Sequence, residues 1–160
     1  MISGEEVMDK ITSIFSKKEK KRRDRSIAFF VDGPNIIRKE MNVDLADVRK
    51  KVAEYGDIKV CKVFLDQYAS EKLIEAMVNQ GYTPVITTGD VDVMMAVEAT
   101  EQIFNPKIDT IAIMTRDIDF RPVLVKAKEM GKETILVGVE QGFSAALKNT
   151  ADILIIAKTR

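Results

Sequence analysis

The stretch Ile27-Ala28-Phe29-Phe30-Val31-Asp32-Gly33-Pro34-Asn35 places a run of apolar residues directly before an aspartate and three turn-forming residues. Such a short continuous apolar run, bounded by turn residues, is typical of a strand that is buried on both faces of a parallel sheet. Two further strand-like segments, 85–89 and 111–116, are also followed by acids: Asp90 and Asp92, and Asp117 and Asp119. Because ligands of α/β sheets bind outside the carboxyl ends of the strands, we expect a functional site at this edge.

Outward from this stretch, strand patterns alternate with helical patterns along the chain. We expect strands at 27–31, 58–65, 83–87, 109–114, 134–139 and 153–157, and helices at 44–55, 70–79, 92–104, 122–130 and 144–148. This alternation predicts an α/β fold with a mostly parallel central sheet between two helical layers, a Rossmann-like three-layer α/β/α sandwich. If the strand order reverses beside the first strand, strands 27–31 and 109–114 are neighbours.

Two local patterns refine this prediction. Pro84 places the strand 83–87 at the edge of the sheet, or lies at the start of that strand, because proline cannot donate a hydrogen bond to a neighbouring strand. The helix 92–104 is expected to face the sheet with four apolar residues, namely Val93, Ala96, Val97 and Ile103.

Composition limits the kinds of chemistry that this chain can perform. A length of 160 residues fits one domain. The chain has no histidine, which excludes Ser-His-Asp and Cys-His catalysis, and its one cysteine, Cys61, fits a reducing, cytoplasmic location. No apolar run is long enough to cross a membrane, and the N-terminus has no compact apolar region of the kind that signal peptides carry.

The N-terminal 25 residues differ from the remainder, so we divide the chain into residues 1–25 and a domain at 26–160. Residues 2–15 predict an amphipathic helix that starts with a Ser3/Glu6 capping box. Its apolar stripe comprises Val7, Met8, Ile11, Ile14 and Phe15. The stripe is expected to dock on the domain; the alternatives are a homodimer and a partner protein's helix.

Residues 17–25, KKEKKRRDR, contain seven basic and two acidic side chains. They either extend the helix or form a linker. Lys and Arg side chains in such a run can grip an RNA backbone, since contacts to phosphate dominate nonspecific affinity. The alternative is a solvated helix face or linker without a partner.

The acids that follow the strands are the candidate site. Asp32, Asp92, Asp117 and Asp119 could converge at the carboxyl edge, where like charges raise each other's pKa unless a cation neutralises them. All-oxygen ligation favours Mg²⁺ or Mn²⁺, and such an ion can activate water in a site without histidine. The alternatives are structural: Asp92 or Asp119 as a helix cap, and Asp32 as a turn former. Asp90 is expected to be a loop or cap residue.

Four segments of the sequence resemble the NYN domain family, a branch of the PIN-like nuclease fold. They are FFVDGPNI at 29–36, GDVDVMMAVEA at 89–99, TRDIDFRPVLVKAKEMGKETILVG at 115–138 and LKNTADILIIA at 147–157, so the resemblance covers residues 27–157. The resemblance implies a PIN-like α/β/α sandwich, a divalent metal and RNA as substrate. By position, it makes Asp32 the carboxylate of strand one and Asp92 that of the helix, with Asp117 and Asp119 completing the cluster.

The resemblance also implies roles for neighbouring residues. Asn35 steadies the loop or contacts substrate. Glu98 stands where many members have a second helix acid; its spacing of six residues from Asp92 points it to another face of the helix, where its alternative is to be only solvated. Family members usually carry Ser-Gly before the acidic pair, where this chain has Thr115 and Arg116. Thr115 keeps a hydroxyl that can orient an aspartate; Arg116 either contacts the scissile phosphate or pairs with an acid and blocks the metal. Asn35, Thr115 and Arg116 are therefore the candidate substrate-binding residues.

The leading hypothesis is thus a metal-dependent ribonuclease that acts on single-stranded or structured RNA, with no membrane association. The alternative is a noncatalytic RNA-binding or adaptor module that retains the PIN-like fold. An aspartyl-phosphate phosphatase is disfavoured because that chemistry needs an acid two residues after the nucleophile, and here Pro34 follows Asp32 at that spacing.

Overall fold

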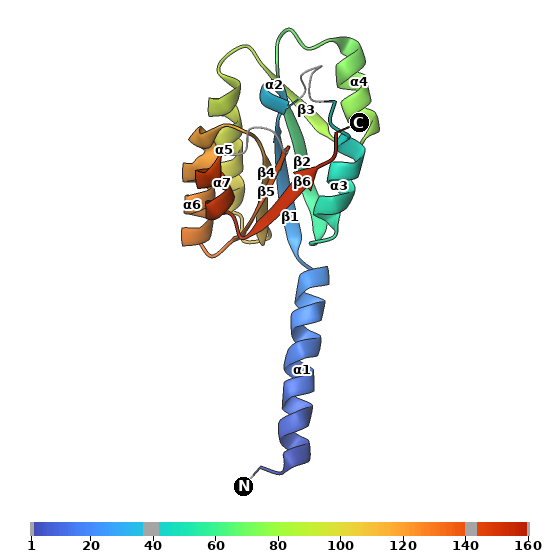
Figure 1. Ribbon diagram of the computed structural model, residues 1–160, viewed down its shortest axis with the longest axis vertical. Helices are drawn as coiled ribbons and strands as arrows, with labels where there is room; N and C mark the ends of the chain where they lie inside the picture. The colour runs from blue at the N-terminus through green and yellow to red at the C-terminus, as the bar shows by residue number, and fades with distance from the viewer. Residues whose placement is uncertain (1, 37–41, 140–143, 160) are drawn as a thin grey trace.

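Six parallel strands form the centre of the molecule, in the order β3-β2-β1-β4-β5-β6 (Figure 1). The computed structural model describes residues 2–36, 42–139 and 144–159, with only the backbone of residues 14–23. The strands are β1 (Ser26–Asp32), β2 (Asp57–Asp66), β3 (Thr83–Thr87), β4 (Thr110–Met114), β5 (Glu133–Val139) and β6 (Ile153–Ala157). All five strand pairings are parallel, so the sheet is parallel throughout.

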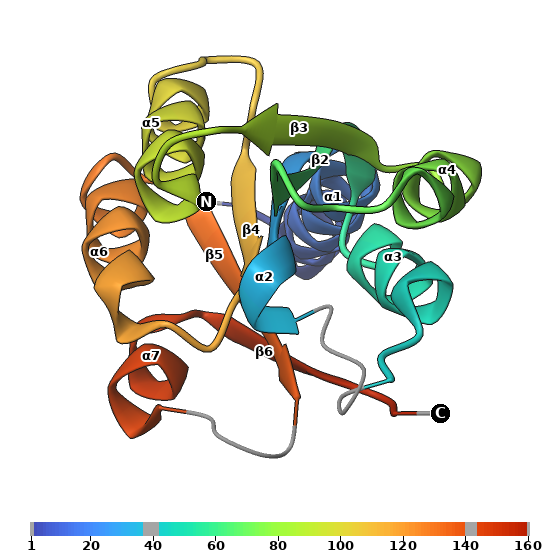
Figure 2. The same cartoon turned by 90° about the horizontal axis from the view of Figure 1, so that it is seen from above.

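Helices cover both faces of this sheet, which confirms the predicted α/β/α sandwich. The helices are α1 (Gly4–Arg23), α2 (Gly33–Ile36), α3 (Leu45–Ala53), α4 (Glu71–Asn79), α5 (Val91–Ile103), the 3₁₀ turn η1 (Ile118–Phe120), α6 (Arg121–Glu129) and α7 (Ala145–Thr150). Viewed from above, α3 and α4 lie on one side of the sheet and α5, α6 and α7 on the other (Figure 2).

The alternating side chains of β1 join two separate cores. Phe29 and Val31 pack in the core beneath α3 and α4, whereas Ala28 and Phe30 pack in the core beneath α5, α6 and α7. Because side chains alternate along a strand, Asp32 at the end of β1 points to the same face as Phe30. The acid is therefore placed on the side of the sheet that α5 covers.

The winding of the chain places β1 at the point where the strand order reverses. From β1 the chain proceeds through β2 to β3, then crosses back to β4 on the other side of β1. Val31 pairs with Met114 in this register, so the residues that follow this pair, Asp32 and Thr115, leave the sheet side by side. The predicted adjacency of the first strand and strand 109–114 is confirmed, as is the edge position of the strand that carries Pro84.

The face that α5 turns toward the sheet agrees only in part with the predicted one. Ile103 is buried and Ala96 packs partly against the core, as predicted, whereas Val93 and Val97 are each about 60% exposed, and Met95 and Ala99 are buried in their place. The prediction was wrong for Val93 and Val97 because residues 93–97 are all apolar, so the local pattern does not identify one face. Packing against β1 decides the helix rotation, and it selects residues spaced four apart.

Helix α1 projects away from the domain, below the amino end of β1 (Figure 1). Ser3 caps it as predicted, with its Oγ accepting a hydrogen bond from the backbone N–H of Glu6 at 3.2 Å. The helix continues through residues 17–23, so the basic run is helical rather than a linker. Val7, Met8 and Ile11 are exposed, and the expected docking of their stripe is therefore wrong. The side chains of Ile14 and Phe15 and those of residues 17–23 lie outside the described residues.

Gly33 is the point at which the chain after β1 packs against the end of β2. A Cβ at this position would overlap the carbonyl oxygen of Phe64 and lie 2.7 Å from Cδ2 of Leu65. We expect Gly33→Ala to lower the free energy of unfolding by about 1–3 kcal/mol in urea denaturation, because the backbone must shift.

Gly89→Ala is the matched control for this substitution. A Cβ at Gly89 would meet only Thr87 Oγ1, at an ordinary contact distance of 3.7 Å, so a change within about 0.5 kcal/mol is expected. Equal stability of the two variants would show that the end of β2 does not constrain residue 33.

Candidate functional site

The candidate site lies at the carboxyl ends of β1 and β4, on either side of the reversal in strand order. Asp32 ends β1, Thr115 follows β4, and Asp92 lies in the first turn of α5. Crevices at such reversal points are the usual ligand sites of doubly wound sheets. Figure 2 shows this edge from above, with α2 rising from the end of β1 between β4 and β2.

Asp32 is completely buried, and its two carboxylate oxygens have different surroundings. Its Oδ2 accepts hydrogen bonds from Nδ2 of Asn35 at 2.7 Å and from Oγ1 of Thr115 at 2.8 Å. Its Oδ1 is buried without a hydrogen-bond partner within the described parts of the chain. A buried carboxylate oxygen without a partner is costly, so Oδ1 is a candidate position for a cation.

Thr115 connects Asp32 to the acidic turn after β4. The backbone N–H of Asp117 donates to Thr115 Oγ1 at 3.0 Å, and the hydroxyl donates onward to Asp32. This geometry confirms that the hydroxyl orients an aspartate. Thr115 is fully buried, which favours the first of its two predicted roles, orienting an aspartate, over contact with substrate. Asn35 donates a hydrogen bond to Asp32 and so ties the segment after β1 to the end of that strand, which agrees with its predicted role of steadying the loop. Substrate contact by Asn35 stays a prediction.

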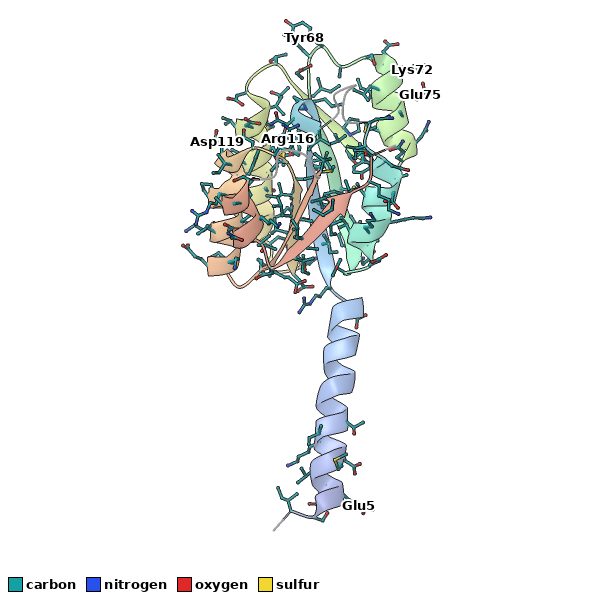
Figure 3. The ribbon with its side chains drawn as sticks, viewed as in Figure 1. Glu5, Tyr68, Lys72, Glu75, Arg116 and Asp119 are labelled. Atoms are coloured by element: carbon teal, nitrogen blue, oxygen red, sulfur yellow. The ribbon has the colours of Figure 1, made fainter. Side chains whose placement is uncertain are left out.

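Asp117 and Asp119 have unequal positions in the turn. Asp117 is half-buried and caps η1, its Oδ1 accepting from the backbone N–H of Asp119 at 2.9 Å. Asp119 is exposed and lies on the flank of the domain that α5, α6 and α7 form (Figure 3). Arg116 lies nearer the middle of the domain in this view and is half-buried. The two roles that the sequence suggests for Arg116 both stay predictions.

Asp92 is held at the start of α5 by a cap that another acid provides. Asp90 is the N-cap, as expected of it, and its Oδ1 accepts from the backbone N–H of Asp92 at 2.9 Å. The alternative in which Asp92 itself is the cap is therefore wrong. Its carboxyl group is half-buried in the first turn, where the helix dipole favours a negative charge. The carboxylate of Asp92 is therefore not used to cap the helix, and it interacts with Asp32 and Asp117 instead.

The acids act on one another electrostatically. Loss of solvation raises the pKa of Asp92 to about 6, with further contributions from the charge of Asp32, a hydrogen bond with Asp117, and the charges of Asp117 and Asp90. Burial also raises the pKa of Asp32, against the lowering effect of its hydrogen bonds with Asn35 and Thr115. Asp32, Asp92 and Asp117 therefore form one interacting group, whose members a dication would stabilise as carboxylates.

The side chains in this group fit a hard cation, although they do not form a closed ligand set. Among the described residues, no group of three or more acidic or cysteine side chains stands close enough to hold a metal ion. The unpartnered Oδ1 of Asp32 and the raised pKa values of Asp32 and Asp92 are nevertheless features that bound Mg²⁺ or Mn²⁺ would relieve. Asp119 is exposed and is not among the residues that shift the pKa of Asp32 or Asp92; its part in metal binding stays a prediction.

Glu98 is separate from the acidic group. Its Oε1 pairs with Nζ of Lys62 at 3.2 Å, and both side chains are partly buried. As predicted, Glu98 lies away from Asp92, but it is paired with a strand residue instead of being solvated. Its charge is thereby neutralised within the protein.

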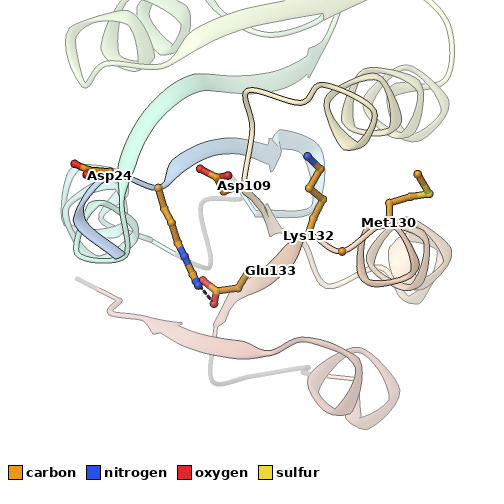
Figure 4. Close-up of a pocket in the computed structure, with 7 residues that line it drawn as sticks. Asp24, Asp109, Met130, Lys132 and Glu133 are labelled. Atoms are coloured by element: carbon orange, nitrogen blue, oxygen red, sulfur yellow. Dashed lines mark hydrogen bonds and ion pairs between the residues drawn. The ribbon is translucent and has the colours of Figure 1, made fainter. Parts of the chain in front are cut away.

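Two pockets lie at opposite ends of the sheet. One, of about 430 Å³, adjoins the candidate site and is lined by Gly33, Pro34, Leu65, Asp66, Tyr68, Ala69 and Leu73. This pocket was not predicted from the sequence, in which a single aromatic residue, Tyr68, in the loop after β2 is the one feature that points to it. The other, of about 420 Å³, lies at the amino ends of the strands, near the base of α1 (Figure 4).

The pocket in Figure 4 is lined mainly by charged groups that hold the strand ends together. Arg25 forms an ion pair with Glu133, and Asp109 accepts a hydrogen bond from the backbone N–H of Ser26 at 2.9 Å. Nζ of Lys132 donates to the carbonyl of Asn105 at 3.0 Å. These contacts account for the charges structurally, so we place the functional site at the opposite end.

The comparisons agree with this geometry. The family model of the NYN domain matches residues 26–157. This chain belongs to the NYN domain family. The family is part of the PIN-like nuclease superfamily, whose members generally use divalent metals. The match covers β1 to β6 and leaves out α1.

The proteins that the chain resembles include a sequence relative and a solved structure. The uncharacterized protein MJ0482 of Methanocaldococcus jannaschii is 54% identical over 149 residues, which cover 92% of this chain and 62% of that protein. The chain thus spans less than two thirds of this relative. A crystal structure of VPA0982 from Vibrio parahaemolyticus, a protein of unknown function, has a TM-score of 0.73 at 18% identity, covering 84% of this chain and 93% of that one. This second likeness supports the fold alone.

Within the described residues, none of the helices has the length and apolar character needed to cross a bilayer.

The raised pKa of Asp92 makes stability depend on pH. The pKa rises from 3.8 to about 6 on folding, so this contribution to stability is complete below pH 3.8 and is lost as the pH rises through about 6. We therefore expect Asp92→Asn to raise the melting temperature in EDTA above pH 6, and the gain to shrink toward pH 4. Asp119→Asn, at an exposed position, is the control. A gain from Asp92→Asn that is constant across this range would contradict the interpretation.

Proposed function

We propose that this protein is a divalent-metal-dependent ribonuclease that hydrolyses phosphodiester bonds at the Asp32 site. The observation that carries the proposal is the buried Oδ1 of Asp32, which has no hydrogen-bond partner among the described residues while Asn35 and Thr115 hold its other oxygen. A carboxylate fixed in this way is prepared to bind a cation. The NYN family membership supports nuclease chemistry.

The residues divide into ligands and positioning groups. Asp32, Asp92 and Asp117 would hold Mg²⁺ or Mn²⁺, and Asp119 would join them on the exposed side. The bound ion supplies activation of water and stabilisation of charge at the phosphate. Asn35 and Thr115 fix the rotamer of Asp32, and Asp90 fixes the start of α5, on which Asp92 is carried. Because ligating carboxylates must be ionised, the pKa of about 6 at Asp92 links metal affinity to pH.

RNA is the proposed substrate, and the basic run at 17–25 supports it with a dense set of cations. This run and the aspartates lie at opposite ends of β1 (Figure 1). A seven-residue strand spans about 23 Å, so one RNA would need to extend along the domain to reach both. The single cysteine, Cys61, supports a cytoplasmic location for this reaction.

A noncatalytic RNA-binding or adaptor module is the second candidate. The absence of a closed three-acid group among the described residues, together with an arginine beside the acidic turn, favours it. Calorimetric titration with Mn²⁺ separates the two candidates, because a nuclease of this kind must bind the ion and an adaptor need not. Binding that Asp32→Asn removes would support the metal centre.

Removing an acid at the centre of the site tests the nuclease proposal. We expect the purified protein to cleave RNA in Mn²⁺ and Asp117→Asn to lower the rate at least about 100-fold, since even outer-shell changes at metal sites cost about 10–100-fold. Asp57→Asn, an exposed acid at the other end of the sheet, should keep full activity. Cleavage by Asp117→Asn at the wild-type rate would assign the activity to a contaminant.

The hydroxyl of Thr115 gives a second test that leaves every acid in place. Thr115→Val preserves the shape of the side chain but removes the donor to Asp32 Oδ2 and the acceptor for the N–H of Asp117. We expect Mn²⁺ affinity to fall about 10–100-fold. Thr115→Ser restores the hydroxyl and should restore the affinity. If valine and serine variants bind Mn²⁺ equally well, the hydroxyl does not position Asp32.

A further inference from the structure

The pocket beside the candidate site is continuous with the segment that carries Asp32. Gly33 and Pro34, which follow Asp32 directly, form one wall, and Leu65 and Asp66 at the end of β2 form another. Gly33 packs tightly against the backbone of β2 at Phe64, so the two walls are fixed relative to each other. A group in this pocket would therefore be held at a defined position against the segment that follows Asp32, on the α4 side of the sheet.

Tyr68 stands at this pocket with most of its surface in solvent. It is 84% exposed, the highest value among the large hydrophobic side chains whose exposure is described. It projects at the top of the domain, at the end opposite α1 (Figure 3). A single exposed aromatic residue is common and means little by itself. Here, however, Tyr68 lines a pocket whose wall includes Gly33, the residue after the buried Asp32.

The loop that carries Tyr68 is fixed by hydrogen bonds at both ends. Oδ1 of Asp66 accepts from the backbone N–H of Tyr68 at 2.9 Å, and the backbone carbonyl of Asp66 accepts from the N–H of Ala69 at 3.2 Å. Ser70 then caps α4, its Oγ accepting from the N–H of Leu73 at 3.1 Å. The backbone of Tyr68 is thus presented in a set conformation, which lowers the entropy cost of binding a ligand to its ring.

The lining of the pocket indicates what it can bind. Proline, leucine, alanine and tyrosine provide apolar walls, and of the described lining residues Asp66 is the one that carries a charge. A negative charge repels phosphate but accepts hydrogen bonds from amino and imino groups. Apolar walls, an aromatic ring and one hydrogen-bond acceptor match the apolar faces and the N–H groups of a nucleobase. A volume of about 430 Å³ lies in the range of pockets for small ligands.

We propose that this pocket receives one unstacked base of a single-stranded RNA substrate, with the base stacked on Tyr68 and its backbone led across Asp32. This inference rests on the proposed ribonuclease function and adds its substrate class. A base in a duplex is stacked and paired and cannot enter, whereas single-stranded loops and ends can offer one. Tyr68 and the pocket therefore select single-stranded over duplex RNA.

A fluorescent substitution at this position tests the proposal directly. The chain contains no tryptophan, so Tyr68→Trp creates a single indole that keeps an aromatic stacking surface. We expect single-stranded oligoribonucleotides to quench its emission in EDTA, where no cleavage occurs, and duplex RNA of the same sequence to leave it unchanged. Equal quenching by both forms, or by neither, would overturn the proposal.

Affinity measurements give the second readout. Tyr68→Ala should weaken binding of single-stranded RNA about 5- to 150-fold, the range that loss of one base–aromatic stack produces. Tyr68→Phe keeps the ring and is the matched control, expected to bind as the wild type does. In Mn²⁺, the loss should appear in KM, with kcat retained. Wild-type affinity in Tyr68→Ala would overturn the inference.

These outcomes separate this inference from the function on which it rests. Quenching at residue 68 without Mn²⁺-dependent cleavage would support the base pocket and remove the nuclease proposal. Cleavage that survives in Tyr68→Ala with an unchanged KM would support the nuclease and remove the pocket.

Discussion

The carboxylate of Asp32, buried where β1 ends, is the constraint to which the rest of the site is fitted. Placing an ionised group in a protein interior costs several kcal/mol unless it is compensated. Here compensation comes from both sides of the reversal in strand order: Asn35 after β1 and Thr115 after β4 donate to the same oxygen. The other oxygen is left uncompensated by described residues. Such local cost within an otherwise well-packed sheet is expected at functional sites.

The fold was predictable because parallel strands impose a simple pattern. Strands buried on both faces appear as continuous apolar runs, and crossover handedness leaves few possible orders. The adjacency of β1 and β4 followed from these rules, and it brings Asp32 and Thr115 together. The predictions failed for two helices whose apolar residues do not by themselves determine which face packs against the sheet, or whether any face does. The apolar run 93–97 did not identify the buried face of α5. The apolar stripe on α1 predicted an amphipathic helix correctly, but it did not predict whether that face packs against the domain.

The site was less predictable than the fold because side-chain roles depend on short turns. The sequence placed acids at the correct edge, yet the division of labour among them required the structure. Asp90 rather than Asp92 caps α5, and the turn η1 leaves Asp117 half-buried and Asp119 exposed. Thr115 was predicted both to orient an aspartate and to bind substrate, and its burial favours the first role. Distances of about 3 Å decide these assignments, and spacing along the chain cannot resolve them.

Helix α1 leaves the domain from the amino end of β1, which is the end remote from the aspartates. Its 20 residues correspond to about 30 Å of helix. In mechanical terms the helix is a spacer: whatever its tip attaches to is held about 30 Å below the sheet. The carboxyl ends of the strands, where Asp32 lies, face away from that tip. A partner bound at the tip of α1 and a long polymer bound at the proposed site would therefore not compete for the same space.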